Sequence, residues 1–140
     1  MPFRMDEDRR DALDAVLPAI ARFRRIFGQE ITPAFVAELI AARELDLSLP
    51  DRLNEPGADA VDPAGQRYQI KYRSASTLNV DLNTFDFDHL VLVNMDDHYT
   101  VTGMWLLPVD RAKEIFSFRP KFRKYQTTQQ KLKREATRIR

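Results

Sequence analysis

Three polar residues flank a predicted tight turn near the middle of the chain. The letters DPAG at 62–65 suit a type I turn that ends on a left-handed glycine, a frequent connection in β-hairpins. If Asp62 opposes Gln66 across this turn, strand alternation places Asp59 opposite Gln69. Lys71 follows two residues later on the same face. The spacing therefore predicts that Asp59, Gln69 and Lys71 lie together.

The same register predicts the pairs that belong to the rest of the hairpin. Val61 faces Arg67, and Ala60 faces Tyr68. The second face then carries Ala60, Tyr68 and Ile70, which can pack on a core. The hairpin is thus expected to be apolar on one side and polar on the other.

A carboxylate, an amide and an ammonium group at one place suit the cleavage of a phosphodiester. That reaction uses a divalent cation that lowers the pKa of an attacking water, and a positive group that stabilises the developing charge. Asp59 can ligate Mg²⁺, and Gln69 and the Ile70 carbonyl can offer neutral oxygens. Lys71 can orient the water or balance the charge.

Two helices are expected before the hairpin. Apolar residues follow steps of three and four over residues 6–27, where Pro18 is expected to kink or divide the helix and Gly28 to close it. Thr32 and Pro33 then start a second helix that ends near residue 45. Residues 47–58 have the proline and glycine content of a loop.

The second half of the chain is expected to continue with strands. The run HLVLVNM at 89–95 reads as a buried strand, and YTVTGMWLLP at 99–108 reads as the next one. Residues 109–116 suit a short helix or turn, and residues 128–139 suit a basic terminal helix.

Length and composition are those of one globular domain. The chain has 140 residues, of which 44% are hydrophobic and 31% are charged. It has no cysteine and only His89 and His98, so a metal site would hold a hard cation on oxygen ligands. No apolar run is long enough to span a membrane, and the first residues do not read as a secretory signal, so we expect a cytoplasmic protein with no membrane partner.

Positive charge gathers at the end of the sequence. Residues 119–140 hold nine Lys and Arg residues and one Glu, a net charge of +8, which leaves −7 for the remainder. Such a segment is a candidate nucleic-acid arm, or else a solvated helix that docks on its own acidic domain. The candidate contacts for nucleic acid are Arg73, Arg119, Lys121, Arg123, Lys124, Lys131, Lys133 and Arg134.

The stretch GADAVDPAGQRYQIK resembles the motif of the PD-(D/E)XK superfamily of restriction-endonuclease-like nucleases. In that superfamily an aspartate precedes a turn, and a Glu/Gln-x-Lys triplet follows on the next strand. The resemblance extends over about residues 34–108. It departs from the motif at Ala58, which replaces proline, and at Gln69, which replaces an acidic residue and removes one negative charge from the metal site.

The resemblance implies a fold, an activity and a further ligand. The expected fold is an α/β restriction-endonuclease-like core with a mixed four-stranded sheet flanked by helices. The nuclease-like domain would cover residues 1–118, with its core at about 32–108, and a basic tail or helix would cover residues 119–140. Glu38 stands where members of the superfamily have a supporting glutamate, and Glu44 is its substitute.

The implied activity is Mg²⁺- or Mn²⁺-dependent endonucleolytic hydrolysis of DNA. A chain this short has little room for a sequence-reading domain, so specificity would come from a homodimer or a partner subunit. The alternative function is a non-catalytic nucleic-acid-binding or assembly module with a degenerate nuclease fold. The acidic charge that is missing at Gln69 supports this alternative. Purely structural roles are also open for the single residues: Asp59 can cap the loop, Lys71 can protect a strand edge against aggregation, and Glu38 can be a solvated residue at the flank of its helix.

Overall fold

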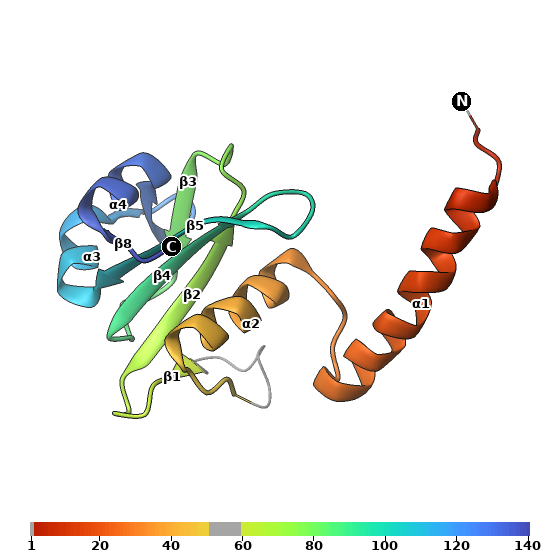
Figure 1. Cartoon of the computed structure of the whole chain (residues 1–140). Coiled ribbons are helices and arrows are strands. Elements are labelled where there is room, and N and C mark those ends of the chain that lie inside the picture. Colours follow the sequence, from red (N-terminus) through yellow and green to blue (C-terminus); the bar gives the residue numbers. More distant parts are fainter. Residues whose placement is uncertain (1, 51–59) are drawn as a thin grey trace. The chain divides into compact units, whose positions relative to one another are not determined.

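A computed structural model describes residues 2–50 and 60–140 and divides the chain into two compact units. Unit 1 is Met1–Thr32, and unit 2 is Pro33–Arg140 (Figure 1). Asp59 is not among the described residues, so its predicted place opposite Gln69 stays a prediction.

Unit 1 consists of one helix with a cap at each end. Helix α1 spans Glu7–Phe27, and the side chain of Asp6 accepts a hydrogen bond from the Arg9 N–H at 3.0 Å. Gly28 ends the helix in the left-handed conformation (φ 69°), and its N–H donates to the Arg24 carbonyl at 2.8 Å. The predicted bounds are thus confirmed at both ends.

The helix runs through Pro18 without a break, so the predicted division there is wrong. Proline removes one backbone hydrogen bond, the one that would reach the carbonyl of Asp14, and the bonds before and after it hold one helix. Among the described helices, α1 included, none combines the length and apolar content that a membrane crossing requires.

The main sheet of unit 2 is mixed. Its order is β1-β2-β4-β5-β8, in which β2 and β4 are parallel and the other neighbours are antiparallel. The described sheet therefore has five strands, where the sequence predicted four. The strands are β1 Ala60–Val61, β2 Arg67–Arg73, β4 His89–Met95, β5 Val101–Pro108 and β8 Thr137–Arg138.

The predicted register of the β1–β2 hairpin is confirmed over its described pairs. Ala60 pairs with Tyr68, and Val61 pairs with Arg67. Gly65 has a φ of +86°, as the turn requires, and the Asp62 carboxylate accepts hydrogen bonds from backbone N–H groups inside the turn. Local turn chemistry is enough to set which residues of β2 face which side.

Helix α2, Pro33–Leu45, covers one face of the main sheet (Figure 1). Ala37 and Ala41 are fully buried, and their small side chains let the helix pack closely on the strands. The predicted core face of the hairpin lies here, since Ala60 and Ile70 belong to the same buried cluster.

A second sheet and two short helices belong to the other face. This sheet has the order β3-β7-β6, built from β3 Asn79–Leu82, β7 Lys124–Thr128 and β6 Ser117–Arg119. Helices α3, Val109–Ile115, and α4, Gln129–Glu135, share a buried cluster with Leu90, Leu92 and Leu107 of the main sheet. Helix α3 was predicted as a short helix or turn, whereas β3 was not predicted.

The basic C-terminal segment supplies strands and a helix to unit 2. The expected helix over residues 128–139 covers only Gln129–Glu135, and extended residues on both sides of it form β7 and β8. Strand pairing accounts for this difference: β7 binds β3, and Arg138 of β8 pairs with Trp105 of β5. Leu132 is fully buried between these elements.

We predict that Leu132→Ala lowers the free energy of unfolding of unit 2 by about 2–5 kcal/mol, because it leaves a cavity in the core. The matched control is Gln130→Ala on the exposed side of the same helix, with an expected change within about 0.5 kcal/mol. Urea denaturation of both variants measures the difference. Equal stabilities would show that α4 does not pack as described.

Candidate functional site

Strand β2 carries the predicted site residues on the face opposite α2. Ile70 is buried in the cluster that includes α2, and side chains alternate along a strand. Gln69, Lys71 and Arg73 therefore lie on the second face, and all three are half-buried. Two of the three residues that the sequence placed together, Gln69 and Lys71, thus share a face in the structure.

Lys71 lies in a partly desolvated place among charges of both signs. Burial is the largest cause that lowers the pKa of its ammonium group, and the positive charges of Arg73 and Lys124 lower it further. The carboxylates of Asp81 and Glu38 act in the opposite direction and raise this pKa. The pKa of the lysine at the position that the motif identifies is therefore lower than that of an ordinary lysine.

Glu38 is brought into the electrostatic reach of Lys71. It comes from α2, it is half-buried, and burial raises the pKa of its carboxyl while Lys71 lowers it. The substitute, Glu44, instead forms an ion pair with Arg140 at 2.8 Å. Of these two helix glutamates, the structure associates Glu38 with the candidate site.

The Ile70 carbonyl points toward the outer edge of β2. The Arg67 carbonyl accepts from the Asp88 N–H at 2.9 Å, and the Arg73 carbonyl accepts from Asn94 Nδ2 at 2.9 Å, so these two carbonyls point toward β4. Carbonyl directions alternate along a strand, which sends that of Ile70 the other way. Beyond Tyr68, no described strand pairs with β2 on this edge.

The candidate oxygen donors of α2 and β2 are of the kind that Mg²⁺ and Mn²⁺ prefer. They are the Glu38 carboxylate, the Gln69 amide and the Ile70 carbonyl, all hard oxygen ligands. Within residues 2–50 and 60–140, no three His, Asp or Glu side chains gather at one point. The described donor types fit a hard cation, and the predicted aspartate ligand, Asp59, falls outside this part of the chain.

Arg73 is held by backbone carbonyl groups. Its Nε donates to the Asn79 carbonyl at 3.2 Å, and its Nη1 donates to the Tyr72 carbonyl at 2.7 Å. Arg73 therefore links β2 to β3 while adding positive charge next to Lys71.

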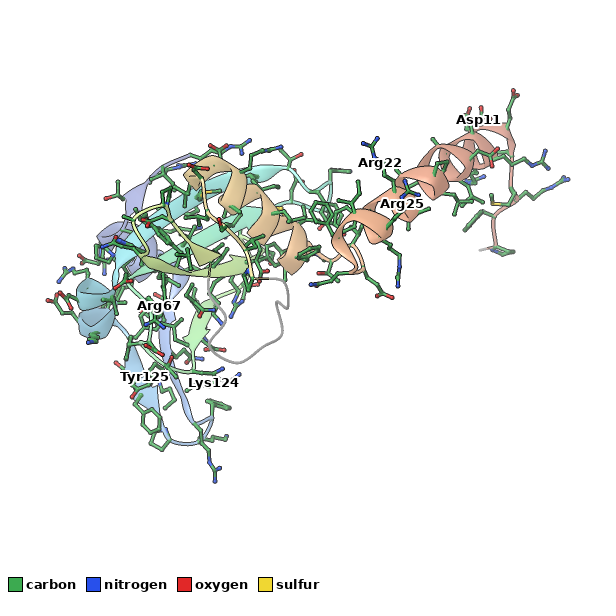
Figure 2. All side chains as sticks on the ribbon, turned by 90° about the horizontal axis from the view of Figure 1, so that it is seen from below. Asp11, Arg22, Arg25, Arg67, Lys124 and Tyr125 are labelled. Carbon is green, nitrogen blue, oxygen red and sulfur yellow. The ribbon has the colours of Figure 1, made fainter. Side chains whose placement is uncertain are left out.

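The other predicted nucleic-acid contacts are spread over the second sheet and α4. Lys124 comes from β7 and lies beside the strand β3 (Figure 2). Lys133 lies over the Trp105 ring at 4.4 Å, and burial lowers the pKa of its ammonium. Arg119 ends β6, Lys121 and Arg123 lie in the turn before β7, and Lys131 and Arg134 lie on α4.

Two groups that interact with Lys71 or with Arg73 were missed by sequence reasoning. Asp81 of β3 acts on Lys71, and the alternation of polar and apolar residues in NVDL was the signal that could have found it. Asn94 is buried and donates to Gln129 Oε1 at 2.9 Å as well as to the Arg73 carbonyl. The sequence signal that could have found Asn94 was its position as a polar residue inside the apolar run of β4.

Comparison with protein-family models gives no match for this chain, and comparison with curated proteins gives none either. The resemblance to the PD-(D/E)XK superfamily therefore rests on the residues and the geometry described above.

We predict opposite changes in the pKa of Lys71 when its neighbours are neutralised. Glu38→Gln removes a negative charge and lowers this pKa further, whereas Lys124→Gln removes a positive charge and raises it. NMR titration of the Lys71 side chain measures both, with Lys113→Gln on α3 as the control that leaves the pKa unchanged. Shifts in the same direction, or none, would contradict the described arrangement.

Proposed function

We propose that this chain is a metal-dependent endonuclease of the PD-(D/E)XK type that hydrolyses DNA phosphodiester bonds at the outer edge of β2. The observation that carries the proposal is the setting of Lys71, a partly desolvated lysine with the Glu38 charge nearby. It lies on the strand that follows the DPAG turn, on the same face as Gln69. Ionisable groups with shifted pKa values occur often at functional sites.

The proposed roles follow from the chemistry of each group. Asp59, Gln69, Glu38 and the Ile70 carbonyl are the proposed oxygen ligands, and Asp59 supplies the charge that Gln69 lacks. A bound Mg²⁺ or Mn²⁺ would neutralise the phosphate and acidify the attacking water. Lys71 stabilises the negative charge that develops on the phosphate oxygens.

Because its pKa is lowered, Lys71 has a second proposed role. An ammonium with a lowered pKa gives up a proton more readily than an ordinary lysine, so it can also orient and exchange protons with the attacking water. Arg73 contributes by keeping that pKa low, and its backbone hydrogen bonds hold its charge in place.

We predict that the purified chain cuts plasmid DNA in Mg²⁺ or Mn²⁺, and that Lys71→Ala and Asp59→Ala each lower the cleavage rate by about 10²-fold or more. Gel analysis of supercoiled and linear DNA measures the rate. Matched controls are Lys113→Ala on α3 and Asp97→Ala in the β4–β5 turn, which remove the same charges at exposed positions. Metal removal by EDTA abolishes cutting in every active variant.

The same experiment separates the endonuclease from the non-catalytic module. Cutting that persists in both Lys71→Ala and Asp59→Ala would show that the reaction does not take place at this site. Absence of cutting by the unaltered chain with either metal, while DNA is still bound, would favour the degenerate nuclease fold.

We predict that Gln69→Glu strengthens metal binding. The substitution restores the missing negative charge among the proposed ligands, and one added charge near a divalent cation is worth roughly a tenfold change in affinity. Isothermal titration with Mn²⁺ measures it, and Gln66→Glu in the exposed turn of the same hairpin is the control for charge alone. Equal affinities for both variants would place the metal elsewhere.

A further inference from the structure

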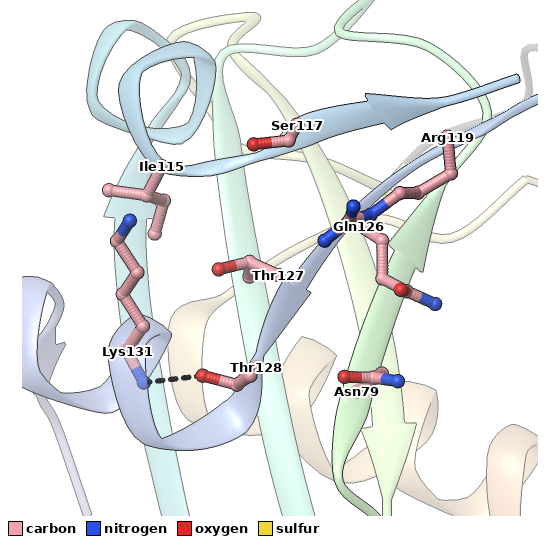
Figure 3. A pocket seen from close by; sticks show the side chains of 8 residues that line it. All are labelled: Asn79, Ile115, Ser117, Arg119, Gln126, Thr127, Thr128 and Lys131. Atoms are coloured by element: carbon pink, nitrogen blue, oxygen red, sulfur yellow. Dashed lines mark hydrogen bonds between the residues drawn. The ribbon is translucent and has the colours of Figure 1, made fainter.

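The second sheet contains a polar cavity that the proposed catalytic site does not use. Its volume is about 210 Å³, and it opens between the strands of this sheet and α4. The side chains that line it and carry the argument are Asn79, Ser117, Arg119, Gln126, Thr128 and Lys131 (Figure 3).

Strand register explains why these side chains meet. Val80 and Leu82 point into the core, so their neighbours in β3 point to the outer face. Asn79 pairs with Thr128, and Ser117 pairs with Gln126, which puts residues from three strands on that face. Arg119 is two residues beyond Ser117 and shares its side of β6.

The lining has the donors that a phosphate group requires. Arg119 and Lys131 are positive, and no carboxylate is among the lining side chains. The Thr128 hydroxyl accepts from the Lys131 N–H at 3.1 Å and keeps its own proton for a ligand. Ser117 and Asn79 add neutral donors.

Two acidic groups beside the lining residues are already engaged. Asp81 accepts from Gln126 Nε2 at 2.8 Å, and the second hydrogen of that amide remains to be donated. Glu135, which follows Lys131 on α4, is bound by Arg111. Two cations and several neutral donors thus converge on a cavity whose neighbouring carboxylates already have partners.

The cavity lining and Lys71 have an interaction partner in common. Asp81 interacts with Lys71 and with Gln126, so it is the common neighbour of the candidate catalytic lysine and the cavity. Lys124, which also acts on Lys71, is on the same outer face of β7 as Gln126. One polymer with regularly spaced phosphates can therefore contact both places.

We propose that the cavity between β3, β7, β6 and α4 binds a backbone phosphate of the nucleic acid that reacts at Lys71, away from the bond that is cut. The inference rests on the proposed action on nucleic acid and adds a second anchoring point to it. Phosphate contacts position a nucleic acid without reading its sequence, so the cavity sets where the strand lies.

The test uses the full chain with Lys71→Ala and without metal, so that binding is measured apart from cleavage. In this background, Arg119→Ala and Lys131→Ala each lower the dependence of log Kd on log salt for duplex DNA by about 0.9, the value for one lost phosphate contact. The matched control is Lys113→Ala, which removes an equal charge from the exposed side of α3 and leaves the slope unchanged.

Inorganic phosphate serves as the second probe. We expect it to shift the backbone NMR signals of Ser117 and Thr128, and the Arg119→Ala/Lys131→Ala double variant to abolish these shifts. If phosphate binds there but the DNA salt slope does not change, the cavity takes a free anion and the proposal is wrong. If neither probe responds to these substitutions, the cavity is not an anion site.

These outcomes are independent of the proposed endonuclease activity. DNA binding that depends on Arg119 and Lys131, in a chain that never cuts DNA, would retain the phosphate site and overturn the endonuclease. Metal-dependent cutting that depends on Lys71, with no effect of Arg119 or Lys131 on binding, would do the reverse.

Discussion

The alternation of side chains along β2 is the constraint on which the rest of unit 2 depends. Ile70 is buried beneath α2, so Lys71, as the next residue, lies on the opposite face near β3 and β7. A slip of one residue would bury the ammonium under α2 and turn Ile70 toward polar groups. Two features oppose such a slip: the left-handed Gly65 in the turn, and the parallel pairing of β2 with the fully buried residues of β4.

A buried pair of amides then holds the second sheet in relation to that strand. Asn94 donates to the Arg73 carbonyl at the end of β2 and to Gln129 Oε1, and the Gln129 amide donates to the carbonyls of Ser74 and Thr77. These bonds fix the connection through which the chain passes from β2 to β3. Because buried amides are costly when unpaired, loss of either partner would disturb that connection. The position of Asp81 near Lys71 therefore depends on residues that do not touch Lys71 themselves.

Local signals made part of this architecture predictable, and long-range pairing accounts for the rest. The DPAG turn was sufficient for the hairpin register. Apolar periodicity with Gly28 predicted α1, and Thr32 with Pro33 predicted the start of α2. Strands β3 and β7 pair residues far apart in the sequence, such as Asp81 with Gln126, and nothing in either segment alone reveals its partner. The charge of the C-terminal segment suggested a solvated helix, because its few apolar residues, including the buried Leu132, are widely spaced. Asp81 was missed because β3 is short and lies in a polar stretch.

Judged by the stability of the fold alone, the surroundings of Lys71 are unfavourable for its charge. Burial opposes its charge, and the positive groups of Arg73 and Lys124 oppose it further, while Asp81 and Glu38 compensate in part. The ion pairs within the described residues do not include Lys71, so the structure does not give it the direct partner that a purely structural buried lysine needs. An apolar residue of similar length would fit the half-buried surface without the cost of removing a charge from water. A positive charge that is disfavoured in the free protein gains most when an anion arrives, and a phosphate at the edge of β2 is an anion that can use it. The same reasoning applies to the cavity beside β7, where two further cations face a common space.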